Sequence, residues 1–282
     1  MSANTAVQGG QNSGPGKSPG LWMDCPWMDI VEGRDPNTVG VYSHFDFRKM
    51  KLSTNINAAI AYWDQGLLAF GSDGAVIAAL AAQNGGVTIS SDGDNEGLSF
   101  QQVVAPYKIS RATKRLWFEV RIKRSAITDT KFGAFFGLGE LMTLSATVPI
   151  AAAGTIADQN LVGWHILEGD GDQADFIYKA NGVTQVTLRT DAISGGIVAD
   201  TWVKLGFKWD PADKDGPNLL TMFVDGGCRT TTAGLAGYTM ASADGTDFPN
   251  DVILSPMIAL LNATGTTPGT LSISDLWCAQ LL

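Results

Sequence analysis

Alternation of apolar and polar residues with a period of two constrains the fold of this chain more than any other sequence feature. It is clearest in ADTWVKLGFKWDP, residues 199–211. One face of this run carries Val203, Leu205, Phe207 and Trp209, and the other carries Trp202, Lys204, Gly206 and Lys208. Such a period is typical of a β-strand that buries one face. The next run, 219–227, ends in the turn signal DGG, so the two runs are predicted to pair as antiparallel strands.

The same alternation returns along most of the chain after residue 58. It is continuous in RLWFEVRIKRS, residues 115–125, and shorter runs with turn signals between them follow as far as the C-terminus. A short helix is an alternative at 75–82, but no strand–helix–strand alternation is visible. We therefore predict an all-β fold, an antiparallel β-sandwich of about ten to a dozen short strands. The side chains expected between its two sheets include Phe118, Val120, Leu205, Phe207 and Met222.

The composition agrees with one large β-domain and limits the partners. The 282 residues are 45% hydrophobic and 17% charged, which is enough for a sizeable core. A chain with a net charge of −9 has no basic footprint for nucleic acid and is repelled by an anionic membrane, so neither is an expected partner. The first 20 residues lack the apolar core of a signal peptide, so we expect synthesis in the cytoplasm.

Three regions of the chain differ in their residue content. Residues 1–20 are mainly Gly, Ser, Asn, Gln and Pro, which predicts a flexible N-terminal arm. Residues 21–57 are rich in Trp, Met and Phe but show little periodicity, and residues 58–282 contain the predicted β-sandwich. The middle region is either an anchor that docks on a partner or a segment that wraps the protein's own core.

We favour the anchor, because the strand pattern from residue 58 onward looks complete without the preceding residues. The sandwich is therefore expected to fold without residues 1–57. The aromatic and methionine side chains of the anchor are the ones that would bury apolar surface against a partner. The predicted partner-binding residues are Trp22, Met23, Trp27, Met28, Phe45 and Phe47.

Several motifs, taken in order, carry a resemblance to a known family. They are GGVTISSDGDNEGLSFQ (85–101), LWFEVRIKRSAITDTKFGAFFGLGE (116–140), ADTWVKLGFKWD (199–210), LTMFVDG (220–226), DFPNDVILSPMIALLNAT (247–264) and GTLSISDLWCAQ (269–280). With these motifs the chain resembles virion structural proteins of tailed bacteriophages that carry a concanavalin A-like, laminin G-like jelly roll. The resemblance implies a concanavalin A-like β-sandwich, here with an extended N-terminal arm.

The resemblance implies a structural role on a phage particle. Such proteins include capsid decoration or cement proteins, so the implied function is to bind the outer capsid surface and stabilise it. The implied partners are the major capsid protein and sister subunits in a dimer or trimer. An acidic chain suits that outer face, away from packaged DNA. The alternative is a carbohydrate-binding, lectin-like module of a fibre or tail that attaches to host glycans.

No catalytic set emerges from the sequence. Sandwiches of this type include glucanases, which need two carboxylates facing each other across a sugar. Glu119 is followed on the same strand face by Arg121 and Lys123, so we predict an ion-paired surface residue instead of a catalytic acid. The two histidines are His44 and His165, and the chain contains no Gly-x-Ser-x-Gly or His-Glu-x-x-His motif. We predict that the protein is not an enzyme.

Two acidic turns are candidates for a calcium site, because laminin G-like sandwiches bind calcium at rim loops. The candidate ligands are Asp92, Asp94 and Glu96 in the first turn and Asp170, Asp172 and Asp175 in the second. The first turn is not an EF-hand, because Val103 stands where that loop needs Glu. The alternative is a pair of solvated hairpin turns, in which Asp and Gly are favoured in any case. The three cysteines are too sparse for a disulfide framework or a zinc site, and no other cofactor is predicted.

Overall fold

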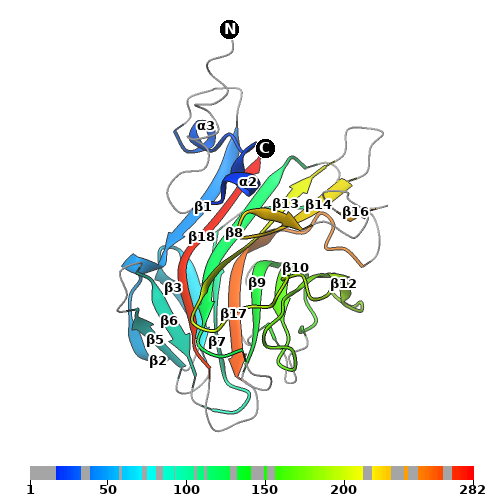
Figure 1. Cartoon of the computed structure of the whole chain (residues 1–282). Coiled ribbons are helices and arrows are strands. Elements are labelled where there is room, and N and C mark those ends of the chain that lie inside the picture. Colours follow the sequence, from blue (N-terminus) through cyan, green and yellow to red (C-terminus); the bar gives the residue numbers. More distant parts are fainter. Residues whose placement is uncertain are drawn as a thin grey trace.

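The computed structural model describes residues 17–32, 39–56, 59–71, 75–80, 85–91, 93–104, 107–110, 113–127, 132–140, 149–150, 156–211, 218–229, 238–240, 247–262 and 269–282. These residues form two antiparallel β-sheets that pack face to face as a β-sandwich (Figure 1), which confirms the predicted all-β fold. No helix in this described part of the chain is long and apolar enough to span a membrane.

One sheet has ten strands. In spatial order they begin with β15 (Gly227–Arg229), β14 (Asn218–Val224), β13 (Trp202–Asp210), β8 (Leu116–Arg124), β18 (Leu271–Leu281), β6 (Val87–Ser90), β5 (Ala75–Ala79) and β2 (Ser53–Ile56). Beside this row, β1 (Gly40–Asp46) pairs with β18, and β16 (Tyr238–Met240) pairs with β14. The turn predicted at DGG joins β14 to β15. Its residues Asp225 and Gly226 have φ angles of 50° and 77°, as a type I′ hairpin turn requires.

The other sheet has eight strands. In spatial order they are β12 (Val186–Arg189), β11 (Asp175–Lys179), β10 (Leu161–Ile166), β9 (Phe132–Glu140), β17 (Leu254–Asn262), β7 (Gly97–Gln102), β4 (Leu67–Gly71) and β3 (Ala59–Asp64). The helical elements of the described residues are short: α2 (Pro19–Trp22), α3 (Trp27–Glu32) and the 3-10 turn η1 (Phe47–Lys49). Within the range 75–82, where a helix was the alternative, residues Ala75–Ala79 form β5 instead, with Ala75 and Ile77 buried and Ala78 exposed, and residues 81 and 82 lie outside the described residues.

The core lies between the two sheets and contains the residues predicted for it. β13 and β8 pair with Leu205 opposite Val120 and Phe207 opposite Phe118, and all four side chains are fully buried. The Phe207 ring stacks on Phe118 with 5.1 Å between centroids, and it meets Phe176 of the other sheet edge-on at 5.4 Å. These contacts join the two sheets, so the period of two correctly identified the buried face of both strands.

The sandwich begins earlier in the chain than predicted. β1 pairs with β18 along its whole length and β2 pairs with β5, so both strands belong to the ten-stranded sheet and not to a separate anchor. Phe45 and Phe47 are buried in the core between the sheets. The structure thus contradicts the expectation that the sandwich is complete without residues 1–57, because their removal would unpair one side of β18 and expose core residues.

Replacing Phe207 with Ala is expected to destabilise the folded protein by about 3–5 kcal/mol, because it removes a ring that contacts both sheets and leaves a cavity. The measurement is the free energy of unfolding in urea. Thr187→Ala on β12, at an exposed position, is the control and should change stability by less than about 0.5 kcal/mol. Equally small effects of the two substitutions would contradict the placement of Phe207 in the core.

Candidate functional site

The outer face of the ten-stranded sheet, which points away from the core, combines charge with aromatic surface. Its residues on β8 alternate with core residues, and they are Trp117, Glu119, Arg121 and Lys123. The register places Lys204 of β13 opposite Arg121. Residues 17–32, called the N-terminal cover, pack on part of this face through α2 and α3. Figure 1 shows them in dark blue beside β1 and the C-terminal end of β18.

Glu119 fixes the N-terminal cover to the sheet. The residue is only 2% exposed. Its carboxylate accepts hydrogen bonds from the Ser18 amide at 3.1 Å, the Ser18 hydroxyl at 3.2 Å and Trp22 Nε1 at 3.0 Å, and Lys204 Nζ lies 3.7 Å away. Burial raises the pKa of Glu119, while the charge of Lys204 and these hydrogen bonds oppose that shift. The predicted surface ion pair with Arg121 is therefore wrong, because the partners come from β13 and from a segment about 100 residues away in sequence.

Apolar contacts join the N-terminal cover to the same face. The apolar cluster consists of Leu21, Trp22, Cys25, Trp27, Trp117, Phe223 and Ala279. At Gly206 of β13, a Cβ atom would lie 2.5 Å from Leu21 Cδ2, so the missing side chain makes room for the cover. Asp24 adds polar contacts at the edge, accepting a hydrogen bond from Trp117 Nε1 at 3.0 Å and pairing with Lys208 at 2.5 Å.

The ammonium group of Lys17 lies among three indole rings. Its Nζ is 3.0 Å from the ring centroid of Trp27, 4.5 Å from that of Trp277 on β18 and 5.2 Å from that of Trp22. Cation–π attraction favours the charged form in such a cage. Lys17 is nevertheless only 5% exposed, and burial lowers its pKa to about 7. A group that holds the N-terminal cover therefore changes its charge near neutral pH.

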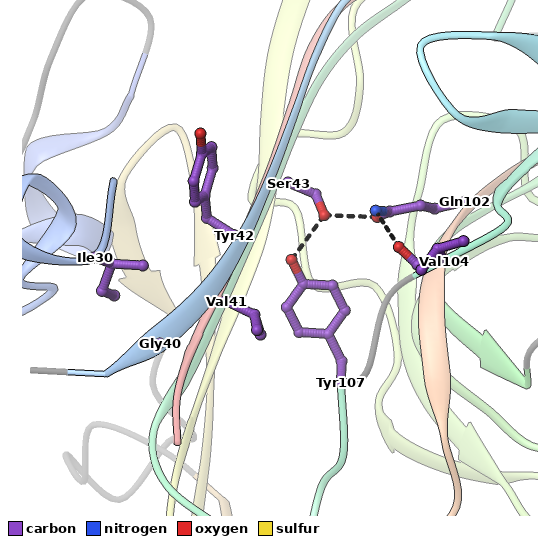
Figure 2. Close-up of a pocket in the computed structure, with 8 residues that line it drawn as sticks. All are labelled: Ile30, Gly40, Val41, Tyr42, Ser43, Gln102, Val104 and Tyr107. Atoms are coloured by element: carbon purple, nitrogen blue, oxygen red, sulfur yellow. Dashed lines mark hydrogen bonds between the residues drawn. The ribbon is translucent and has the colours of Figure 1, made fainter. Parts of the chain in front are cut away.

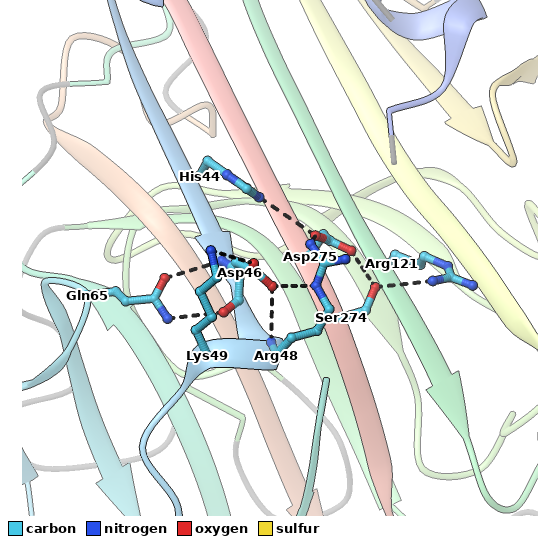
Figure 3. A network of polar contacts seen from close by, with 8 residues as sticks. All are labelled: His44, Asp46, Arg48, Lys49, Gln65, Arg121, Ser274 and Asp275. Carbon is cyan, nitrogen blue, oxygen red and sulfur yellow. Dashed lines mark hydrogen bonds and ion pairs between the residues drawn. The ribbon is translucent and has the colours of Figure 1, made fainter. Parts of the chain in front are cut away.

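A row of polar contacts crosses the part of the outer face beside the N-terminal cover (Figure 3). Arg48 Nη2 donates to Asp275 Oδ1 at 3.3 Å, and Ser274 Oγ donates to Asp275 Oδ2 at 2.6 Å. Arg121 Nη1 donates to Ser274 Oγ at 3.4 Å, and its guanidinium carbon lies 4.4 Å from the ring centroid of Trp202. These five residues, called the outer-face strip, come from η1, β18, β8 and β13, so the row runs across the sheet.

The outer-face strip and its neighbours carry an excess of positive charge. The network in Figure 3 contains the cations Arg48, Lys49 and Arg121 and the carboxylates Asp46 and Asp275. Burial alone would raise the pKa of both carboxyl groups, but hydrogen bonds and the charge of Arg48 hold both pKa values below their usual range. Both are therefore ionised at neutral pH. Three positive charges against two negative charges leave one positive charge, on a chain whose net charge is −9.

A pocket of about 280 Å³ opens between the N-terminal cover, β1 and the end of β7 (Figure 2). Its lining residues are Ile30, Gly40, Val41, Tyr42, Ser43, Gln102, Val104 and Tyr107. Ser43 Oγ donates to Gln102 Oε1 at 2.6 Å and lies 2.8 Å from Tyr107 Oη. Burial raises the pKa of Tyr107, so its hydroxyl stays protonated. These polar groups bond to one another, and none of the lining residues is an activated nucleophile or a base.

The structure buries most of the predicted partner-binding residues inside the same chain. The buried ones are Trp22, Trp27, Phe45 and Phe47. Met23 is 68% exposed, and Met28 packs, partly buried, against the apolar cluster of the N-terminal cover. The protein's own sandwich therefore covers these aromatic rings, which is the alternative that we did not favour. Of the six side chains, a partner can reach only the two methionines.

The first candidate calcium turn lies between β6 and β7. Asp92 lies outside the described residues. Asp94 is exposed and accepts a hydrogen bond from Asn95 at 2.8 Å, and Glu96 is partly buried. Asn95 has a φ angle of 57°, a left-handed conformation that Asn adopts readily in turns. The described side chains of this segment therefore fit a hairpin turn.

The second candidate calcium turn joins β10 to β11 and brings several carboxyl groups near one another. Burial and the neighbouring Asp191 raise the pKa of Asp170 to about 6, and the nearby Asp172 and Asp175 add to the shift. Asp175 also accepts a hydrogen bond from the Asp191 amide at 3.1 Å. Within the described ranges, no three Asp, Glu, His or Cys side chains are placed to hold a metal ion. Calcium binding remains a prediction from the sequence alone.

Sequence reasoning did not single out the outer-face strip. The period of two correctly placed Trp202 and Arg121 on outward faces of their strands. Only the register shows that β8 and β13 are neighbours and that β18 brings Asp275 opposite Arg121, after a shift in pairing between Ile273 and Asp275. The one local signal was Trp202 itself, a large aromatic residue on the polar face of an alternating strand.

Two antiparallel sheets in this strand order define a lectin-like, concanavalin A-like jelly roll. A protein of unknown function from Shewanella oneidensis MR-1 has a similar structure, with a TM-score of 0.52 and 13% identity over 86% of this chain and 87% of that one. Peanut lectin has a TM-score of 0.51 and 12% identity over 86% and 98% of the two chains. A carbohydrate esterase from Shiga toxin-encoding bacteriophage phi24B has a TM-score of 0.47 and 15% identity over 82% and 99%.

Similarity at these identities concerns the fold alone. The sequence matches no protein-family model and no curated protein. The comparisons therefore confirm the jelly-roll fold that the motif order implied, and a ligand has to be argued from the residues of the outer face.

Through Lys17, the folded protein is expected to gain stability as the pH rises from 7 to about 9. The pKa of Lys17 is about 7 in the folded state and 10.5 when unperturbed, so the unfolded chain binds more protons between these values and stability rises with pH there. Lys17→Met has no charge to titrate and should lose this part of the pH dependence in urea unfolding. Lys114→Met, at an exposed position, is the control. An equal rise in the Lys17→Met and wild-type proteins would show that Lys17 keeps its ordinary pKa.

Proposed function

We propose that the protein is a non-enzymatic, lectin-like module of a bacteriophage particle, and that its outer-face strip attaches the particle to host carbohydrate. The observation that carries this proposal is the contact between Arg121 and Trp202. A partly exposed indole ring and a guanidinium group lie 4.4 Å apart on the outer face of a sheet. The N-terminal cover occupies a different part of the same face.

The outer-face strip and the adjacent Lys123 offer both kinds of surface that a sugar ring needs. One face of a sugar ring is lined by C–H groups and packs on a flat aromatic ring, whereas the hydroxyls need hydrogen-bond partners around the edge. Trp202 supplies the apolar surface. Arg121, and Lys123 with its Nζ 6.0 Å from the same ring, supply donors beside it. All three project from the paired strands β8 and β13, so the sheet sets their spacing before a ligand binds.

The carboxylates of the outer face support binding without catalysis. Glycoside hydrolysis needs a carboxylic acid with a raised pKa and a second carboxylate across the sugar. Glu119 has a raised pKa, but the N-terminal cover buries its oxygens and donates hydrogen bonds to them. Asp46 and Asp275 have lowered pKa values and are paired with Arg48, so neither suits the role of proton donor.

The resemblance of the sequence to virion structural proteins of tailed bacteriophages supports placing this module on a phage particle. Peanut lectin shares the fold, although that likeness says nothing about a ligand of this chain. A particle that displays many copies binds a surface through many sites at once, so a weak single site suffices for attachment. On this proposal the protein is synthesised in the host cytoplasm and incorporated into the virion.

The full-length protein is expected to bind at least one polysaccharide on an array of bacterial surface glycans and to release no reducing ends from it. Trp202→Ala should weaken binding about tenfold or more, because it removes the packing surface for the sugar ring. Tyr42→Ala removes an exposed aromatic ring outside the outer-face strip and is the control. The proposed function fails if no glycan binds, or if Trp202→Ala binds as well as the control.

A second candidate is the capsid decoration or cement function, and exposed apolar side chains around the pocket favour it. Val104 is 71% exposed and Tyr42 is 46% exposed, and both line the pocket. Leu282 and Val39 are 59% and 56% exposed and join each other through a backbone hydrogen bond of 2.8 Å. An apolar rim of this kind suits a protein partner. In this case the rim contacts the major capsid protein, and sister subunits form a dimer or trimer about a capsid symmetry axis.

Co-sedimentation with particles that lack this protein tests the second candidate. The wild-type chain is expected to load on the order of hundreds of copies per particle, as repeated capsid sites require. Replacing both Val104 and Leu282 with Ser should reduce loading about tenfold or more, whereas Val198→Ser, at a position 60% exposed elsewhere, should not. Saturation at a dozen copies or fewer would contradict a capsid role and fit a tail or fibre module.

A further inference from the structure

Arg121 differs from its cationic neighbours on the outer face because none of the described carboxylates pairs with it. Lys204 lies 3.7 Å from Glu119, and Lys208 lies 2.5 Å from Asp24. Among the residues that the structure describes, no carboxylate oxygen comes within ion-pair distance of the Arg121 guanidinium, whose side-chain contacts are with Ser274 and the Trp202 ring. Its positive charge is therefore available to a ligand.

The guanidinium of Arg121 also keeps most of its hydrogen-bonding capacity. Its bond to Ser274 Oγ is long, at 3.4 Å, and that hydroxyl donates its own proton to Asp275. Arginine has five N–H donors in a planar fork, and this fork matches the two oxygens of a carboxylate. Because the group rests on Trp202 at 4.4 Å, a ligand would meet it already oriented.

The surroundings favour a ligand with isolated negative charges. The network around the outer-face strip has one positive charge in excess, but the whole chain carries −9, which disfavours a densely charged polyanion such as nucleic acid. Lys123, two residues along β8, is 3.7 Å from Asp200, whose side chain is 72% exposed. The Lys123 side chain is 19% exposed, but a 3.7 Å pair with an exposed carboxylate is weak, so Lys123 can exchange Asp200 for a ligand at little cost.

We propose that the carbohydrate bound by the outer-face strip is acidic: the Arg121 fork holds the carboxylate of a uronic or sialic acid unit while Trp202 packs on an adjoining sugar face. This inference rests on the proposed carbohydrate-binding function and names the ligand class of the same site. Each acidic sugar unit carries one carboxylate among neutral hydroxyls. Its single negative charge matches the single positive charge of the Arg121 guanidinium.

Matched pairs of ligands test this inference with the full-length chain. Oligomers of galacturonic, glucuronic, mannuronic and sialic acid are compared by calorimetry with the same oligomers after their carboxyl groups have been reduced to alcohols. At least one acidic oligomer is expected to bind about tenfold more tightly than its reduced form, because only the acid offers a bidentate, charged partner. The difference should shrink as the salt concentration rises from about 0.05 M to about 0.5 M, because salt screens the contact.

Substitutions of Arg121 assign the preference to this residue. Arg121→Gln should lose the preference for the acidic oligomer and keep the affinity for the reduced one. Arg121→Lys should keep part of the preference, because the charge remains while the planar fork is lost. Lys179→Gln, which removes a positive charge from an ion pair on the other sheet, is the control and should keep all of it. If Arg121→Gln does not fold, the test rests on Arg121→Lys. Full retention of the acidic preference in Arg121→Lys would contradict the proposal that the planar guanidinium holds the carboxylate.

The outcomes separate this inference from the proposed function. Equal binding of acidic and reduced oligomers by the wild-type chain, with loss of both in Trp202→Ala, overturns the acidic specificity and leaves carbohydrate binding in place. Retention of the preference in Arg121→Gln overturns the assignment to Arg121. The absence of binding to any glycan, acidic or neutral, overturns the proposed function and this inference with it.

Discussion

The arrangement of the outer face depends on one buried carboxylate. A buried charge without partners is strongly destabilising, so Glu119 needs the hydrogen bonds donated by Ser18 and Trp22 and the positive charge of Lys204. The N-terminal cover that supplies these donors has helices of only four and six residues, too short to be stable in isolation. The two parts therefore depend on each other: the cover satisfies the carboxylate, and the sheet supplies the apolar surface on which the cover orders.

This mutual dependence decides which part of the outer face a ligand can reach. Trp117 is fully buried beneath the N-terminal cover. Trp277 lies between Trp27 of the cover, 5.2 Å away between ring centroids, and the imidazole of His44, stacked on it at 3.4 Å. Trp202 takes no part in the contacts described for Trp117 and Trp277, and its ring lies against the Arg121 guanidinium instead. The position of the outer-face strip thus follows from where the cover ends.

Sequence reasoning succeeded for properties that are local in the chain and failed for those that depend on distant segments. Which face of a strand is buried is local, because successive side chains alternate, and Phe207 was correctly placed in the core. The environment of Glu119 is not local, because its donors lie about 100 residues away, and a following Arg in the sequence gave no sign of them. β1 was assigned to an anchor for the same reason: its partner, β18, is at the other end of the chain. Predicting the outer-face strip would have required the pairing register of β8, β13 and β18. The sequence of a single strand does not contain that information.

A small positive patch on an acidic protein selects for charge spacing as well as for charge. At physiological ionic strength the Debye length is about 8 Å, so a ligand approaching the outer-face strip is attracted mainly by the nearest cations. A ligand with charges spaced closely along its length also carries some of them beyond this patch, where the net charge of −9 on the chain repels them. A bidentate pair between a partly exposed arginine and a carboxylate contributes on the order of 1–2 kcal/mol, so Arg121 alone cannot hold a ligand and must act with the Trp202 ring. A single module of this kind would bind weakly and specifically, and repetition on a particle would turn that specificity into firm attachment.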